Sequence, residues 1–238
     1  MPSILLLPGL ACDAELFQHQ AAALALHARV HVSDAHTRGA TLPEMARLLW
    51  AEHPGRQVLV GASMGGMLAL EMHRQAPARV AALALLGSTA RPDTPELITL
   101  RTKACELFAN GRLDEVLRAN VLFAFHPHGA RAPGLVDRYL AMIRRAGAAQ
   151  LIQQNRAVMA RVDSRPQLPA ILCPVLVACG EADQLTPPEH AREMAALMPQ
   201  AQLDVVPGAG HMLTMEQPER VTALLLRWAT ALDNRARA

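Results

Sequence analysis

The feature of the sequence that most constrains its fold is an alternation of short apolar runs with longer amphipathic stretches. Strand-like runs, rich in Leu, Val and Ala, occupy residues 3–7, 29–33, 57–61, 80–86, 175–179 and 202–206. Helical patterns lie between them, at residues 14–27, 42–53, 64–76, 188–198 and 218–232. Nearly continuous apolar runs are typical of strands that helices cover on both faces. The alternation therefore predicts an α/β fold with a doubly wound, mostly parallel sheet of about six strands.

The alternation stops between residues 91 and 165. Only helical patterns occur there, near residues 95–110, 112–122, 133–146 and 148–160. We therefore expect an all-helical cap, residues 91–165, inserted into a core of residues 1–90 and 166–238. The cap contains 12 of the 23 lysines and arginines but only 7 of the 21 aspartates and glutamates. The net charge of +2 thus divides into +5 for the cap and −3 for the core.

Length and composition exclude several classes of protein. A chain of 238 residues, 51% of them hydrophobic, is large enough for a buried core and too apolar for a disordered protein. A net charge of +2 and only 3% aromatic residues argue against a nucleic-acid partner. No apolar run reaches the ~18 residues of a membrane-spanning helix, so we expect no membrane association.

The cellular compartment is predicted from the opening segment and the cysteines. Residues 1–9 are apolar, lack a charged region and break at Pro-Gly, so we interpret them as a buried strand rather than a signal peptide. The four cysteines are scattered, without a paired C-x-x-C spacing: Cys12, Cys105, Cys173 and Cys179. Because this pattern is typical of free thiols in a reducing compartment, we expect a cytoplasmic protein.

Two expected helix starts carry the same signature. Thr41 and Thr186 are each followed by a proline-containing first turn and by a glutamate three residues later, Glu44 and Glu189. In such a capping box the threonine oxygen accepts a hydrogen bond from the backbone N–H of the third helical residue. We expect both threonines to be N-caps.

The most specific local signal is a Gly-x-Ser-x-Gly motif, Gly61 to Gly65, between a strand and a helix. A tight turn of this kind lifts the serine hydroxyl clear of the sheet, and the small residues on either side let strand and helix approach closely. The N-terminus of the helix then favours negative charge at the site. We interpret Ser63 as a catalytic nucleophile; the alternative is a glycine-rich turn with a bystander serine.

A serine hydroxyl needs a base to take its proton and an acid to orient that base. Asp183 and His211 directly follow the last two strand-like runs. Because the carboxyl ends of parallel strands meet at one edge of a sheet, we expect both side chains near Ser63. The chain order nucleophile, acid, histidine is that of a nucleophile-elbow triad. Glu181 and Asp204 are the weaker candidates for the acid.

The tetrahedral intermediate of acyl transfer also needs backbone donors for its negative oxygen. One expected donor is the N–H of Met64, which follows the nucleophile, and the second is the N–H of Leu10, in the loop after the first strand. Gly9 permits the backbone turn that this loop requires. The alternative for Pro8-Gly9 is an ordinary turn at the end of a strand.

With these motifs the sequence resembles the α/β-hydrolase fold superfamily, in its small, cap-bearing serine esterase/lactonase branch. The resemblance covers nearly the whole chain: the loop after the first strand, the elbow at 61–66, the turn at 180–183 and the Gly-His pair at 210–211. Many relatives have His-Gly where this chain has Pro8-Gly9, and Asp-x-x-Gly-x-Gly where residues 34–39 read DAHTRG. An N-terminal hairpin common in relatives has no counterpart in this sequence.

The resemblance implies a carboxylic ester hydrolase that acts on a small or medium acyl substrate through an acyl-enzyme, with no metal and no organic cofactor. Lactone opening, thioester hydrolysis, C–C bond hydrolysis and a lyase step use the same triad and remain alternatives. A non-catalytic ligand-binding protein is a further alternative, which a complete triad disfavours. A serine at the elbow disfavours dehalogenases and epoxide hydrolases. His126 and His128 are interpreted as part of a polar loop.

The substrate, a small-molecule ester or lactone, is expected to lie between core and cap. We expect Gly9, Phe123, Phe125 and Met142 to contact it; the alternative for the cap side chains is packing between helices. The charge of +5 on the cap suggests an anionic substrate, such as a carboxylate-bearing lactone or an acyl chain on an acidic carrier. The alternative is a solvated arginine surface. The oligomeric state stays open.

Overall fold

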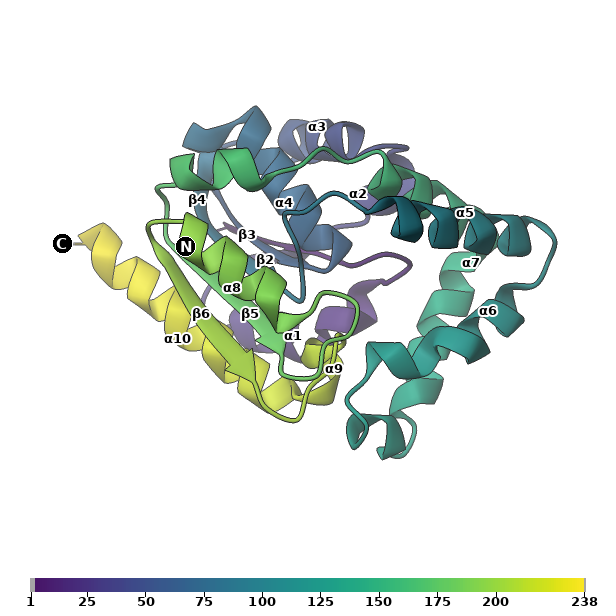
Figure 1. Ribbon diagram of the computed structural model, residues 1–238. Coiled ribbons are helices and arrows are strands. Elements are labelled where there is room, and N and C mark those ends of the chain that lie inside the picture. The colour runs from purple at the N-terminus through teal and green to yellow at the C-terminus, as the bar shows by residue number, and fades with distance from the viewer. Residues whose placement is uncertain (1–2, 238) are drawn as a thin grey trace.

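One parallel sheet organises the molecule (Figure 1). The structure, a computed structural model, describes residues 3–237, with side chains described for residues 3–232. The strands pair in the order β2-β1-β3-β4-β5-β6, and every neighbouring pair is parallel. The strands are β1 Ser3–Leu7, β2 Arg29–Val32, β3 Gln57–Ala62, β4 Val80–Leu86, β5 Val175–Gly180 and β6 Ala201–Val206. Each begins and ends within one residue of its predicted bounds, which confirms the α/β class and the parallel sheet.

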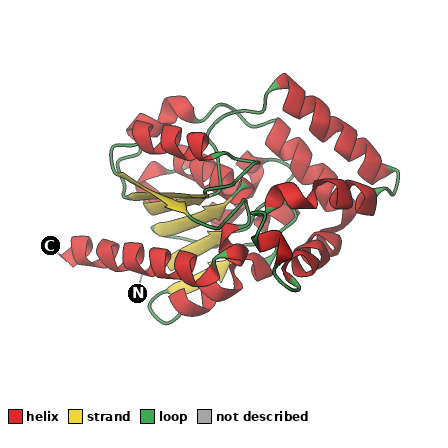
Figure 2. Cartoon of the chain, turned by 60° about the horizontal axis from the view of Figure 1, so that its bottom comes forward, coloured by secondary structure: helices red, strands yellow, loops and turns green. Residues whose placement is uncertain are grey.

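Helices cover both faces of the sheet (Figure 2). The described α-helices are α1 Gln18–Leu24, α2 Ala35–Arg38, α3 Leu42–Glu52, α4 Met64–Gln75, α5 Pro95–Ala109, α6 Leu113–Asn120, α7 Leu135–Met159, α8 Pro188–Leu197, α9 Leu213–Glu216 and α10 Pro218–Arg237. Buried side chains of α3, α4 and α8 pack on one face of the sheet, and those of α1 and α10 pack on the other.

The two faces are separated by the alternation of side chains along each strand. In β1, Ile4 and Leu6 belong to the cluster beneath α1 and α10, whereas Leu5 and Leu7 belong to the cluster beneath α3 and α4. All four are at most 2% exposed. Burying a leucine side chain contributes roughly 1.5–3 kcal/mol, so a slip of register would expose apolar groups on both faces at once. The carboxyl ends of the strands, which carry the loops described below, are therefore held in fixed positions.

Between β4 and β5 the chain forms helices only, among them α5, α6 and α7. These helices stand to one side of the sheet in Figure 1. Helix α7 covers both of the helices predicted at 133–146 and 148–160, and its regular backbone is interrupted between them at Gly147, with φ 76° and ψ 172°. Glycine alone adopts that conformation without strain. The residue bounds of core and cap as separate domains remain a prediction.

Ion pairs join the cap to the core. Arg145 on α7 contacts Asp13 at 2.7 Å and Glu15 at 2.6 Å, and Arg138 contacts Glu15 at 3.2 Å. Each of these acidic residues lies in the loop and short helix that follow β1, outside the cap. These two arginines of the cap are therefore paired with acidic residues of the core and do not form a free basic surface.

One of the two predicted helix caps is confirmed and the other is wrong. Thr41 caps α3, since its Oγ1 accepts a hydrogen bond from the N–H of Glu44 at 3.3 Å. The residue that precedes α8 is Pro187, without a side-chain cap, and Thr186 has a different set of partners described below. Within residues 3–237, no helix is long and apolar enough to cross a membrane.

Candidate active site

Ser63 lies at the turn from β3 into α4, with φ 52° and ψ −118°. A residue other than glycine rarely adopts this region, and holding one there costs roughly 1–3 kcal/mol. The Ser63 N–H donates to the carbonyl of Leu86 at 2.9 Å, and its carbonyl accepts from the hydroxyl of Ser88 at 2.8 Å. A Cβ on Gly61 would collide with the backbone of Gly65, so these glycines allow the strand and helix to meet.

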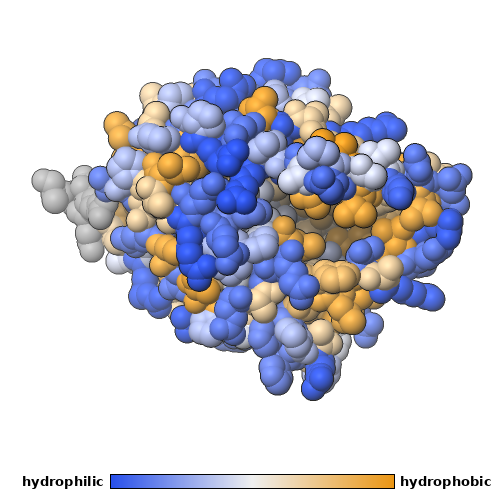
Figure 3. Space-filling model, in the orientation of Figure 1, coloured by the Kyte–Doolittle hydropathy of each residue, from blue (hydrophilic) through white to orange (hydrophobic). Residues whose placement is uncertain are grey.

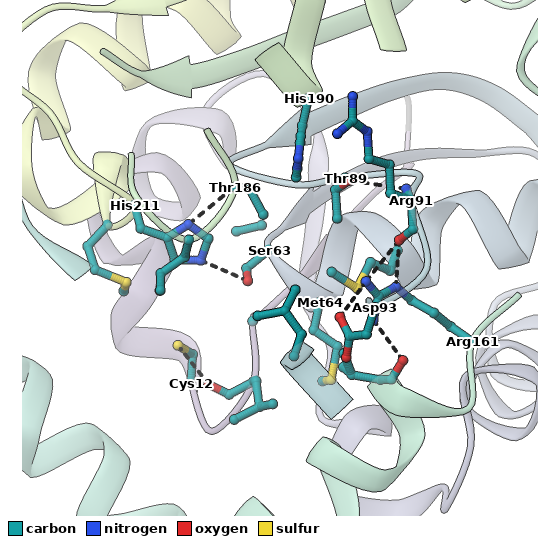
Figure 4. A pocket seen from close by; sticks show the side chains of 18 of the residues that line it. Cys12, Ser63, Met64, Thr89, Arg91, Asp93, Arg161, Thr186, His190 and His211 are labelled. Carbon is teal, nitrogen blue, oxygen red and sulfur yellow. Dashed lines mark hydrogen bonds and ion pairs between the residues drawn. The ribbon is translucent and has the colours of Figure 1, made fainter. Parts of the chain in front are cut away.

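Ser63, His211 and Asp183 form one hydrogen-bonded chain, of which Figure 4 shows the link between Ser63 and His211. His211 Nε2 is 2.9 Å from Ser63 Oγ, and His211 Nδ1 is 2.9 Å from Asp183 Oδ2 and 3.1 Å from Oδ1. The Asp183 side chain is fully buried and that of His211 is 7% exposed. Ser63 is the least buried of the three residues, and it faces the cavity described below. The structure thus brings together the three residues predicted as nucleophile, acid and base.

Asp183 is held as a carboxylate by its neighbours. Oδ1 accepts from the backbone N–H groups of Leu185 and Thr186, both at 2.9 Å, and Oδ2 accepts from the Thr186 hydroxyl at 2.9 Å. Burial alone raises the pKa of Asp183. The nearby His211 and these hydrogen bonds outweigh burial, so the pKa lies below its ordinary value. A carboxylate in this position favours the Nδ1–H tautomer of His211 and leaves Nε2 free to accept the serine proton.

Thr186 is a residue of the site that the sequence interpretation assigned to another role. Its hydroxyl lies 2.9 Å from Asp183 Oδ2 and 3.3 Å from His211 Nδ1. The hydroxyl therefore binds the acid and the base of the site and does not cap α8. The sequence did carry a second signal: an aspartate three residues before a threonine can accept hydrogen bonds from the turn that follows it.

The two predicted oxyanion donors lie on the cavity wall. Leu10 and Met64 both line the cavity that contains Ser63. Within the part of the chain that the structure describes, neither backbone N–H donates a hydrogen bond to another residue. Two N–H groups without partners, beside a serine hydroxyl at a helix N-terminus, are suited to hold a negative oxygen.

A cap side chain fixes the loop that presents Leu10. Gln154, on α7 and fully buried, accepts from the N–H of Ala11 at 2.6 Å and donates to the carbonyl of His36 at 2.9 Å. The His36 ring is 2.7 Å from the carbonyl of Cys12, so one network joins α7, α2 and the loop after β1. Ala11 has φ 56°, a conformation that needs such support. No sequence motif marks Gln154.

A half-buried side chain also ties the cap to the loop of His211. Glu216 on α9 accepts from the N–H of Gly210 at 2.8 Å and from the N–H of His126 at 2.7 Å. Burial raises the pKa of Glu216 to about 7, although both hydrogen bonds oppose the shift. The sequence interpretation assigned Glu216 no role, since nothing in the sequence places it between two loops that lie far apart along the chain.

Ser63 opens into a cavity of about 360 Å³ between the core and the cap helices. In Figure 3, hydrophobic side chains gather around a hollow on the side that carries these helices. The walls are mostly apolar, with Leu10, Leu16, Met64, Met67, Leu97, Tyr139, Val158, Leu185, Met212 and Leu213. Gly9 also lies on the wall, as predicted. A volume of this size suits a small or medium substrate.

Three of the predicted substrate contacts are corrected by the structure. Phe123, Phe125 and Met142 are not on the cavity wall. Phe125 and Met142 are at most 1% exposed and belong to the hydrophobic core, where Phe125 packs edge-on against Tyr139 with ring centroids 5.2 Å apart. Phe123 is 48% exposed on the outside of the cap. Amphipathic cap helices bury their apolar stripe to hold the cap together, and few of those side chains remain for a ligand.

The weaker candidates take other partners. Glu181 accepts from the N–H of Gly208 at 2.6 Å, and Asp204 lies 3.8 Å from Arg220, so neither orients His211. His126 stacks on His128, with ring centroids 5.4 Å apart. In the described part of the chain, no three His, Cys, Asp or Glu side chains are grouped closely enough to hold a metal ion.

Similarity to known proteins extends over nearly the whole chain. Residues 4–224 match the model of the Alpha/beta hydrolase family. A pimeloyl-[acyl-carrier protein] methyl ester esterase from Xanthomonas campestris is 29% identical over an alignment of 248 positions, which covers 97% of this chain and 96% of that protein. A protein of Serratia proteamaculans named as a carbamate hydrolase is 26% identical over 98% of this chain and 92% of its own length. The structure of a thermophilic esterase from Thermogutta terrifontis with malate bound is 30% identical, with a TM-score of 0.89 over 98% of this chain and 90% of that one.

Proposed function

This chain belongs to the alpha/beta hydrolase family, and we propose that within it the protein is a serine hydrolase that cleaves a carboxylic ester. The observation that carries the proposal is the continuous chain from Ser63 Oγ through His211 to Asp183, with a distance of 2.9 Å at each link. A serine held in a strained turn, beside a base and open to an apolar cavity, is suited to attack an acyl carbon.

In the first half of the reaction, His211 Nε2 takes the proton of Ser63 as Oγ attacks the ester carbon. The N–H groups of Leu10 and Met64 hold the negative oxygen of the tetrahedral intermediate. Asp183 stabilises the charged imidazole and keeps its orientation. The intermediate collapses when His211 returns the proton to the leaving alcohol, and the acyl group stays on Ser63.

In the second half, a water molecule replaces the alcohol. His211 removes a proton from this water, which attacks the acyl carbon, and the same two N–H groups hold the second oxyanion. Collapse of that intermediate releases the carboxylic acid and returns the proton to Ser63. No step calls for a metal or an organic cofactor.

The proposed substrate is a small-molecule ester or lactone with a small or medium acyl part. The cavity of about 360 Å³ and its mostly apolar wall support this size and character. The relatives from Xanthomonas and Thermogutta, named as esterases, support the ester bond, and malate bound to the latter supports an anionic substrate. We also propose a cytoplasmic location, because all four cysteines are free thiols in the described structure.

Carbamate hydrolysis is a second candidate, which the relative from Serratia favours. Lactone opening, thioester hydrolysis, C–C bond hydrolysis and a lyase step use the same nucleophile and base. All of these are separated by turnover on a panel of substrates rather than by the position of the triad.

The proposal is tested by labelling with a fluorophosphonate, which reacts with an activated serine, and by assaying p-nitrophenyl esters of rising chain length beside small lactones and an aryl carbamate. We expect labelling and ester turnover in the wild type, and loss of both in Ser63→Ala. Ser164→Ala is the matched control and should keep both, since Ser164 lies away from the cavity that contains Ser63.

Turnover of the carbamate in preference to every ester would identify a carbamate hydrolase, and turnover of the lactones in preference to every ester would identify a lactonase. Labelling that persists in Ser63→Ala would exclude Ser63 as the nucleophile. A folded wild-type protein that is neither labelled nor active on any substrate would favour a ligand-binding function.

A further inference from the structure

One wall of the cavity is charged, in contrast to the apolar remainder. Arg91, Arg101, Arg161 and Asp93 all line it. Figure 4 shows Asp93 and Arg161 on the opposite side of Ser63 from His211. A few polar groups that converge on an apolar cavity commonly fix the orientation of a ligand.

Asp93 and Arg161 are paired with other groups of the protein. The Asp93 side chain is 2% exposed and accepts from Arg161 at one oxygen and from Arg101 at the other, both at 2.8 Å. Every nitrogen of the Arg161 guanidinium donates, to Asp93 and to the backbone carbonyls of Arg91 and Val158. These two side chains are part of the wall, and four of the five N–H donors of Arg161 are already used within the protein.

Arg101 differs from Arg161 in this respect. Its Nε donates to Asp93 and its Nη1 to the side chain of Asn155 at 2.8 Å, but among the described residues Nη2 has no partner. Its side chain is 29% exposed, against 7% for Arg161, and it lines the cavity. Burial lowers the pKa of Arg101, Asp93 opposes that shift and Arg161 adds to it, so its positive charge is incompletely compensated.

The ionic network around this wall has one positive charge in excess. It contains four arginines, Arg91, Arg101, Arg161 and Arg165, but only three acidic residues, Asp93, Asp163 and Glu193. His190 also lines the cavity, and burial together with Arg91 lowers its pKa, so it adds no charge at pH 7. Arg91 donates to Glu193 through Nε, and its two Nη atoms have no partner within the described residues.

We propose that Arg101, supported by Arg91 on the same wall, binds a carboxylate that the substrate carries at a distance from its scissile bond. This inference rests on the proposed function and specifies its substrate class: an ester with a free carboxylate, of which a monoester of a dicarboxylic acid is the simplest form. A single excess charge matches a monoanionic carboxylate rather than a dianionic phosphate. The unpaired Nη2 of Arg101 and the planar Nη fork of Arg91 together suit the two oxygens of a carboxylate.

The test measures binding without turnover. Monomethyl glutarate and dimethyl glutarate have the same chain and the same reactive ester, and only the first has a carboxylate. Their affinities for the Ser63→Ala protein are measured by calorimetry. We expect the monoester to bind about 10- to 100-fold more tightly, as a charge-assisted hydrogen bond predicts. Adding Arg101→Gln should bring the ratio close to one, and Arg91→Gln should reduce it by a smaller factor.

The control is Arg112→Gln, which removes an exposed cap arginine outside the cavity and should leave the ratio unchanged. If Arg101→Gln does not fold, Arg101→Lys, which keeps the charge beside Asp93, should still lower the ratio severalfold, because a single ammonium group cannot hold Asp93 and Asn155 and also present the Nη2 donor. Equal affinities for the two esters, or a ratio that a folded Arg101 variant leaves unchanged, would overturn the proposal.

Failure of this subsite and failure of the proposed function give different results. A wild-type enzyme that hydrolyses both esters with equal kcat/KM keeps the function and loses the subsite. A wild-type protein that hydrolyses neither, while the Ser63→Ala protein still prefers the monoester through Arg101, keeps the subsite and loses the function.

Discussion

The core and the cap supply the cavity with side chains from different kinds of position. In the core, Ser63, Asp183 and His211 each follow the end of a strand, at β3, β5 and β6. In the cap, Arg101 and Gln154 lie within helices, at α5 and α7. A residue after a strand is placed by the sheet alone, because all the parallel strands end at one edge. A residue inside a helix is placed only when that helix has packed against its neighbours.

This difference divides the work of the proposed enzyme. The groups that would touch the reacting atoms come from the core, together with the N–H donors of Leu10 and Met64. The cap contributes part of the cavity wall. It also contacts two catalytic loops, that of Leu10 through Gln154 and that of His211 through Glu216 and His126. Variants in the two regions are therefore expected to fail in different ways.

The largest effect is expected for Asp183→Asn. The substitution keeps the shape of the side chain but favours the wrong tautomer of His211, so kcat should fall by about 10⁴-fold. Activity is measured on the best p-nitrophenyl ester. Asp204→Asn, which alters a carboxylate on β6 that does not reach His211, should stay within about twofold of the wild type. A loss of less than tenfold in Asp183→Asn would mean that another group orients the histidine.

The next effect tests the link from the cap. Gln154→Leu leaves the N–H of Ala11 and the carbonyl of His36 without partners, so the loop that carries the Leu10 donor loses its support. We expect kcat to fall by about 10- to 100-fold with KM nearly unchanged, because an oxyanion donor acts in the transition state. Gln154→Glu keeps the acceptor for Ala11 and should recover part of kcat.

Gln153→Leu is the control for that variant, since Gln153 also lies on α7 but donates to the carbonyl of Gly39 and has no hydrogen bond to the loop of Leu10. A Gln154→Leu protein that changes KM and not kcat would show that the cap acts on substrate binding alone. The catalytic step would then depend on the core and not on the cap.

A smaller, pH-dependent effect is expected for Glu216→Gln. The amide cannot accept both backbone N–H groups that the carboxylate accepts, so the free energy of unfolding should fall by about 1–3 kcal/mol. The pKa of Glu216 is raised to about 7 in the folded protein. Protonation of Glu216 therefore stabilises the folded protein. This stabilisation is fully present below the ordinary pKa of a glutamate and is lost as the pH rises through about 7.

Melting temperatures of wild type and Glu216→Gln are compared from about pH 5 to about pH 8. The advantage of the wild type should shrink as the pH rises, because glutamine does not titrate. Glu219→Gln, at an exposed position in the first turn of α10, should follow the wild type at every pH. An advantage that grows with pH would contradict the raised pKa.

The smallest effect is expected where the cap and core pair through exposed charges. Arg145→Gln removes the contacts with Asp13 and Glu15, but the Arg145 side chain is 49% exposed. Solvent screens such pairs, so unfolding by urea should change by less than about 1 kcal/mol, and the change should vanish in high salt. A decrease of more than about 2 kcal/mol in the free energy of unfolding, unaffected by salt, would show that these ion pairs contribute substantially to holding cap and core together.

The sequence predicted the core more completely than the cap, because the sheet alone places residues that follow strands, whereas packing between helices places residues within the cap. Continuous apolar runs determine the strands, and Ser63, Asp183 and His211 were found because strand ends and a motif mark them. The cap helices were also found from their periodicity, including the interruption at Gly147. The periodicity did not predict which cap side chains face the cavity. Phe125 and Met142 pack in the hydrophobic core, whereas Arg101 lines the cavity.

Thr186, Gln154 and Glu216 show a second limit. Each acts through hydrogen bonds between segments that only the folded chain brings together, apart from the short turn between Asp183 and Thr186. A local pattern carries no information about such partners. The charge split between cap and core was visible in the sequence, but its use in pairs such as Arg145 with Asp13 depends on where the helices dock.

The direct pairing of β4 with β5 has a consequence for chain entropy. Residues 87–174 form one excursion that leaves the sheet after β4 and returns to the neighbouring strand. The entropy lost in closing a loop grows only with the logarithm of its length, by roughly 0.6 kcal/mol for each doubling. An excursion that begins and ends at adjacent strands can therefore be lengthened, shortened or replaced at small cost to the sheet. Its surface contacts, and hence the shape of the cavity, are free to diverge while the strand ends keep their places.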